Sequence, residues 1–112
     1  LNSSHRLVLK SSNQVHLVEI KDIIHIKADG NYSTFYLNDG RKIVISKSTK
    51  EFEEPLFDEG FHRIHKSHIV NINEMSYFDK ADGGTLVMSN GDQVPVASRK
   101  RDLLMELFES LT

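Results

Sequence analysis

The sequence predicts a mostly β domain built largely from antiparallel strands. Short segments rich in β-branched and aromatic residues alternate with period two, and tight-turn signals recur between them. Helical spacing is confined to one internal segment and the C-terminus, which predicts one short internal helix and a C-terminal helix. The strand-like segments are 16–20, 23–28, 33–39, 41–46, 85–89 and 93–98.

Glycine-containing turns separate these segments. The motifs "NDG" (38–40), "ADGG" (81–84) and "SNGD" (89–92) are typical of hairpin connections. Pro95 lies inside a strand-like segment and has no N–H to donate, so an edge strand or a bulge is expected there.

The internal helix is predicted within residues 46–60. Ser48 is a plausible N-cap with Glu51 as its capping-box partner, and Phe52 and Leu56 fall one helical turn apart. In the tail, residues 98–112, the apolar residues at helical spacing are Leu103, Leu104, Leu107, Phe108 and Leu111.

Length and composition indicate one ordinary globular domain. The chain has 112 residues, 38% hydrophobic and 27% charged, without an apolar run long enough to span a membrane or act as a secretory signal. It has no cysteine, which excludes disulfides and thiolate sites and is compatible with a cytoplasmic location. Residues 1–12 are expected to be a linker or an artificial N-terminus, and residues 13–112 the domain.

Charge is unevenly distributed along the chain, although its net value is only −2. Residues 51–59 carry five carboxylates and no cation, whereas 61–68 carry two cations and three histidines, and 98–101 carry three cations. A basic face can coexist with an acidic total. The macrodipole disfavours cations where the C-terminal helix begins, so helix stability does not explain the three cations at 98–101 and a functional role is considered. Plain solvated surface remains an alternative.

The histidines at 62, 65 and 68 do not predict a metal site. Neither helical nor strand geometry places all three on one face, and no carboxylate lies within the stretch to complete a zinc site. The chain also has no nucleophile elbow, no glycine-rich phosphate loop and no recognisable carboxylate pair. We therefore predict no metal, no cofactor and no enzymatic activity.

Donors suited to phosphates and base edges gather in three places. Lysine and arginine supply attraction to the phosphate backbone, and Arg, Lys and Asn can pair with guanine and adenine edges. The candidate residues are Asn31, Tyr32, Ser33, Arg63, His65, Lys66, Ser67, Arg99, Lys100 and Arg101. The sequence contains neither a helix-turn-helix pattern nor C2H2 spacing, so any DNA reading would fall to loops.

The order of segments resembles the LytTR family, the DNA-binding output domain of many bacterial response regulators. The resemblance runs from about Val15 to Phe108 and rests mainly on "FHRIHKSHIVN" (61–71) and "PVASR" (95–99). In the turn "KADGNY" (27–32), Lys27 stands where the family usually has Glu, which leaves the role of that position open.

The resemblance implies an elongated antiparallel fold of three small sheets, with loops that enter successive major grooves. Carried over by position, the contacts fall at 31–33, at the His-Lys-Ser segment, especially Lys66, and after the last strand, especially Arg99. For His65 a structural role, hydrogen-bonded to backbone, is favoured over direct contact with DNA. His68 is expected to face DNA, and His62 is assigned no role.

Within 61–71 the apolar residues and one amide are expected to serve the core and the adjoining turn. These are Phe61, Ile64, Ile69, Val70 and Asn71.

We therefore expect a cytoplasmic, sequence-specific double-stranded DNA-binding domain of a two-component regulator. Its expected partners are repeat sites in promoters, an N-terminal receiver domain in the parent chain and a sensor kinase. The isolated domain is expected to be monomeric and to pair on DNA. The alternative is a protein-interaction module whose basic face meets an acidic partner.

Overall fold

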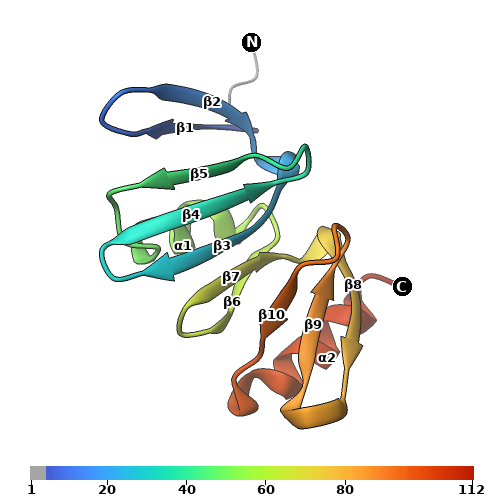
Figure 1. Ribbon diagram of the computed structural model, residues 1–112. Coiled ribbons are helices and arrows are strands. Elements are labelled where there is room, and N and C mark those ends of the chain that lie inside the picture. The colour runs from blue at the N-terminus through green and yellow to red at the C-terminus, as the bar shows by residue number, and fades with distance from the viewer. Residues whose placement is uncertain (1–4) are drawn as a thin grey trace.

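Three antiparallel sheets make up the computed structural model, which describes residues 5–112 (Figure 1). The molecule measures 41 × 32 × 24 Å, so the predicted elongated fold of three small sheets is confirmed. The sheets have the strand orders β1-β2, β5-β4-β3-β7-β6 and β10-β9-β8. The strands are β1 (Arg6–Lys10), β2 (Val15–Glu19), β3 (Ile23–Asp29), β4 (Tyr32–Leu37), β5 (Lys42–Ile45), β6 (Phe61–His65), β7 (His68–Asn71), β8 (Met75–Asp79), β9 (Thr85–Met88) and β10 (Gln93–Pro95).

The first strand lies where a linker was expected. β1 pairs with β2 from Arg6↔Glu19 to Lys10↔Val15, and Leu9 is fully buried. The structure therefore departs from the linker prediction at Arg6–Lys10, because alternate residues of this segment point into the core beside β2. β10 is an edge strand, as Pro95 predicted.

The strands β6, β7 and β8 were not among the predicted segments. All four residues of β7 are buried, because this inner strand is covered on both faces and so shows no alternation. Ile69 packs into one apolar cluster and Val70 into the other. The core predictions for residues 61–71 are confirmed, and the Asn71 amide donates to the Ile23 carbonyl at 3.0 Å.

Two helices complete the fold, as predicted. In α1 (Lys50–Phe57), Phe52 meets Phe35 of the sheet edge-on, with ring centroids 5.0 Å apart, and Leu56 is fully buried. The N-cap of α1 is Thr49 and not the predicted Ser48, and the predicted capping box with Glu51 does not form among the described residues. Ser48 Oγ accepts instead from the Lys50 N–H at 3.3 Å.

The second helix, α2 (Arg101–Ser110), covers the three-stranded sheet and buries Leu104. It begins after a short 3-10 turn at Ser98–Lys100. Two of the three cations therefore precede the α-helix, and only Arg101 lies in its first turn. No helix within residues 5–112 is long and apolar enough to cross a membrane.

Candidate nucleic-acid interface

One end of the five-stranded sheet brings distant parts of the chain together. Because neighbouring strands are antiparallel, the β3–β4 turn, the β6–β7 turn and the segment after β5 all emerge at this end. The backbone N–H of Ala97 donates to the Ile64 carbonyl at 2.9 Å, which brings the residues after β10 alongside the β6–β7 turn. In Figure 1 these segments lie along the left and lower left of the molecule. We call this surface the turn face.

The β3–β4 turn contributes Asn31 and Tyr32, and both side chains are exposed. Gly30 at φ +61° occupies the left-handed region, where a residue with Cβ is disfavoured. Ser33 is different, since it is fully buried and its hydroxyl donates to the Lys47 carbonyl at 2.5 Å. This burial contradicts the expected contact between the Ser33 side chain and DNA, because the hydroxyl already serves the segment after β5.

The β6–β7 turn presents Lys66 to solvent. The N–H of Ser67 donates to His65 Nδ1 at 3.1 Å, and the Ser67 carbonyl accepts from the Ala28 N–H at 2.8 Å. His65 is half-buried and bonded to backbone, which agrees with the favoured structural role, while its DNA contact stays untested. The two bonds hold Lys66 at the tip of a turn that is tied to β3.

Arg63 has all three kinds of guanidinium nitrogen engaged within the protein. Its Nε lies 2.5 Å from Glu53 Oε1, its Nη1 2.6 Å from the Lys66 carbonyl and its Nη2 2.9 Å from Thr49 Oγ1. The side chain is 20% exposed. It therefore joins α1, the residue before α1 and the β6–β7 turn.

The three cations after β10 have different surroundings. Arg99 is exposed, Lys100 is half-buried beside His62 at a separate hollow, and Arg101 is half-buried with its guanidinium 5.6 Å from the Phe78 ring centroid. Arg101 thus packs on the three-stranded sheet away from the turn face. The expected DNA contact of Arg101 stays a prediction, and the structure places this guanidinium over the Phe78 ring.

A shallow depression of about 440 Å³ marks the centre of the turn face. Its lining residues come from the β3–β4 turn, the start of α1, the β6–β7 turn and the segment after β10. They are Ala28, Gly30, Ser48, Thr49, Lys50, Glu53, Arg63, Lys66 and Arg99. Four cationic side chains thus face one carboxylate, in a chain whose net charge is −2.

Lys50 was missed as a site residue by reasoning from the sequence. The segment "SKSTK" (46–50) contains two lysines, but only its Ser48 was singled out, as a helix cap. The cations at 47 and 50 become relevant only because β5 ends at the same edge as the two turns. Both lysines are exposed.

The remaining histidines of the cluster lie inside the fold. His68 is 8% exposed, its ring centroid 5.4 Å from that of His65 and 6.5 Å from that of His25. Burial, together with smaller effects of His65, His25 and Lys27, lowers the pKa of His68 to about 4. The expectation that His68 faces DNA is therefore wrong. Within residues 5–112 no three His, Asp or Glu side chains converge as metal ligands.

His25 extends this row of rings toward the opposite side of the sheet. Its Nε2 lies 2.8 Å from Asp92 Oδ2, and its ring stacks on Tyr36 with centroids 4.2 Å apart. Burial lowers the pKa of His25 despite the opposing effect of Asp92. The imidazole is therefore a neutral packing element that ties the β9–β10 turn to the five-stranded sheet.

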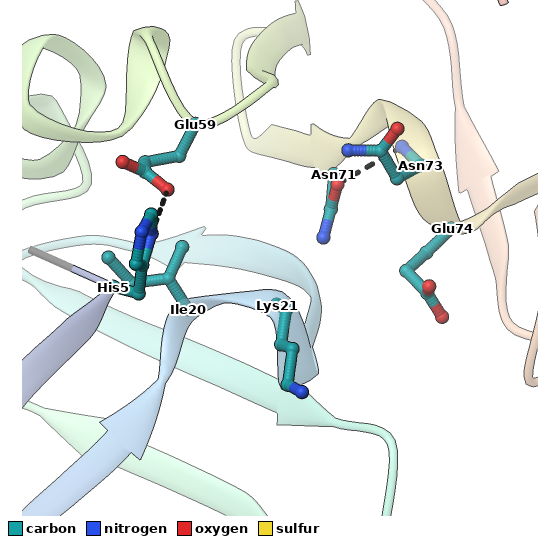
Figure 2. A pocket seen from close by; sticks show the side chains of 7 residues that line it. All are labelled: His5, Ile20, Lys21, Glu59, Asn71, Asn73 and Glu74. Atoms are coloured by element: carbon teal, nitrogen blue, oxygen red, sulfur yellow. Dashed lines mark hydrogen bonds and ion pairs between the residues drawn. The ribbon is translucent and has the colours of Figure 1, made fainter.

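A second hollow, of about 240 Å³, lies at the opposite end of the sheet (Figure 2). Glu59 leans over the His5 ring, with His5 Nδ1 3.6 Å from Glu59 Oε1, while Asn71 accepts from the Asn73 N–H at 3.1 Å. Figure 2 shows Lys21 and Glu74 extending away from this asparagine pair. The polar groups serve the fold around the hollow and do not converge on a ligand.

Comparison with known proteins gives two kinds of match. The model of the LytTr DNA-binding domain family matches residues 13–109. The chain is also 34% identical over 99 residues to the heme-containing CO-sensing transcriptional regulator RcoM 1 of Paraburkholderia xenovorans, covering 86% of this chain and 37% of the relative. It is 26% identical over 95 residues to the sensory transduction protein LytT of Bacillus subtilis, covering 83% of this chain and 39% of the relative.

The solved structures include one with the same fold. A LytTr DNA-binding domain of a Bacillus cereus response regulator superimposes with a TM-score of 0.78 at 24% identity, covering 93% of this chain and 96% of that one. The chain spans 37 to 39% of the length of the two curated relatives described above. With the family model covering nearly the whole chain, the protein belongs to the LytTr DNA-binding domain family.

Proposed function

We propose that this domain binds double-stranded DNA sequence-specifically by placing the turn face against the major groove. The observation that carries the proposal is the convergence of Lys50, Lys66 and Arg99 from three separate segments on one depression. Such a concentration of cations is the expected footprint of phosphate binding, and the membership of the family points the same way.

The exposed residues divide by the contacts their chemistry permits. Lys66 and Arg99 can pair with the acceptor edge of guanine, and Asn31 can pair with adenine. Lys50 and Lys100 suit phosphates, which position a protein without reading sequence. Tyr32, with 53% of its surface exposed, offers an apolar ring beside Asn31. His65 and Ser67 support the β6–β7 turn through their mutual hydrogen bond.

The parent protein is proposed to be a cytoplasmic transcriptional regulator with a separate sensing or receiver domain, and we propose no catalytic role for this domain. RcoM 1 is named as a heme-containing CO sensor and LytT as a sensory transduction protein, so similar domains accompany different inputs. We propose a receiver domain controlled by a sensor kinase here, with paired domains on repeat sites.

The alternative function is a protein-interaction module whose turn face meets an acidic partner. The same cations would serve it, and salt would weaken either complex. Nonspecific DNA distinguishes the two, because it competes for a DNA-binding face. If the face instead binds a specific acidic protein, nonspecific DNA should displace that protein only weakly, through charge alone.

The test is selection from random duplex DNA with the purified chain at about 0.1 M salt. At this concentration the Debye screening length is about 10 Å, so attraction between protein cations and phosphates is still felt. Enrichment of a short motif is expected, and repeats of that motif about one helical turn apart would indicate a paired arrangement. A folded protein that enriches no motif would contradict sequence-specific binding.

A further inference from the structure

We propose that Arg63 is a positioning residue for Lys66 rather than a DNA ligand, an inference that rests on the proposed function. Arg63 lines the depression of the turn face and would pass for a phosphate contact by location alone. Its hydrogen bonds lead to a different role.

The guanidinium is already committed to three partners. Glu53, the Lys66 carbonyl and Thr49 take its Nε, Nη1 and Nη2, at 2.5, 2.6 and 2.9 Å. Thr49 is 3% exposed and is fixed by the fold, whereas the Glu53 side chain is 42% exposed and is anchored to α1 by its backbone. Three of the five guanidinium N–H donors are thus taken inside the protein, and the charged carboxylate competes directly with a phosphate for the guanidinium.

The bond from Arg63 to the Lys66 carbonyl affects the direction of the Lys66 side chain. Lys66 occupies the tip of a two-residue connection between β6 and β7, where backbone direction decides where the side chain points. Arg63 holds one carbonyl of that tip, and the Ala28 N–H holds the next, that of Ser67. We therefore expect loss of Arg63 to misdirect Lys66 and leave the charge of Lys66 intact.

A double-mutant cycle on the selected duplex tests this coupling. Arg63→Met and Lys66→Ala should each weaken binding about tenfold, and the double variant should also lose about tenfold rather than a hundredfold. Arg63→Lys should resemble Arg63→Met, since one ammonium cannot hold three divergent acceptors. Arg41→Met, which removes an arginine from an ion pair at the opposite end of the sheet, is the matched control and should bind like wild type.

Direct contact by Arg63 predicts the opposite results. Arg63→Lys would then bind close to wild type, and Arg63→Met would weaken binding further in the Lys66→Ala background. It would also lower the slope of log K against log salt in that background by about 0.9. Either result would overturn the positioning role.

Glu53→Gln gives a second test that leaves every cation in place. Removing a carboxylate from a DNA-facing depression should strengthen binding on charge alone. If Glu53 holds Arg63 in position, we expect binding about threefold weaker instead. Glu54→Gln is the control, because Glu54 is exposed on the same helix outside the depression.

Tighter binding by Glu53→Gln, equal to that of Glu54→Gln, would refute the positioning role. Circular dichroism melting of each variant identifies any that fail to fold. Failure of the wild type to bind any duplex would instead refute the proposed function, so the two failures are distinguishable.

Discussion

Arginines at the two ends of the five-stranded sheet are bonded in different ways. At the end opposite the turn face, Arg41 bonds Asp39 two residues away, through its N–H at 3.0 Å and its Nε at 2.7 Å. At the turn face, Arg63 bonds three residues from two segments, α1 with its N-cap and the β6–β7 turn. An arginine with a local partner can be replaced without displacing other segments, whereas one that joins several segments sets their relative positions. A surface that must match DNA needs the second arrangement.

The largest expected effect comes from removing the core beneath the turn face. Ile64→Ala should lower the free energy of unfolding by about 2–5 kcal/mol, because Ile64 is fully buried where β6 meets the three-stranded sheet. Urea denaturation measures this change. Val44→Ala, at an exposed position on β5, should lower the free energy of unfolding far less. Equal decreases in the two variants would show that Ile64 does not stabilise the core.

Acid should weaken the fold beside the turn face. The pKa of His68 is lowered to about 4 in the folded state, so the unfolded state binds the proton first as pH falls. The contribution is complete above pH 6.5 and is lost between about 6.5 and 4, by at most about 3 kcal/mol.

Urea denaturation at several pH values measures this loss. His68→Phe should flatten the dependence in that window, and an unchanged slope in the variant would contradict the assignment.

Lys66→Ala and Arg99→Ala should each weaken binding to the selected duplex by about 1–3 kcal/mol. Arg41→Ala at the opposite end should bind like wild type, because it removes the same kind of charge away from the turn face. Fluorescence anisotropy measures affinity, and thermal melting checks that all three proteins fold. Equal binding by all four proteins would show that DNA does not meet this face.

The smallest effect separates support from contact at Ser33. Ser33→Ala should lower the free energy of unfolding by about 1 kcal/mol, because the Lys47 carbonyl loses its donor. DNA affinity should fall much less than in Lys66→Ala. Ser46→Ala, at an exposed position after β5, serves as the control for stability. A loss of affinity as large as that of Lys66→Ala would reinstate Ser33 as a DNA contact.

Sequence reasoning succeeded where local pattern and structure coincide. Alternation and turn motifs predicted most of β2 to β5, β9 and β10 within a few residues, and helical spacing predicted α1 and α2. The sequence did not predict β7, because both faces of this strand are buried and the alternation disappears. It did not predict β1 either, because this short strand lies near the N-terminus, where a linker was expected. A backbone hydrogen bond of His65 was expected, and the structure identifies the Ser67 N–H as its donor.

The sequence by itself determined the β class, the two helices, the family and the stretches of cationic residues, because each depends on residues that are close together in the sequence. Only the tertiary structure decided which cations share a surface. Antiparallel pairing carries Lys50 and Lys66 to one depression, and the contact between Ala97 and Ile64 brings Arg99 beside them. The same packing buries Ser33 and His68 and places Arg101 over Phe78. Exposure and hydrogen-bond partners depend on contacts between residues far apart in the sequence, and no local pattern contains them.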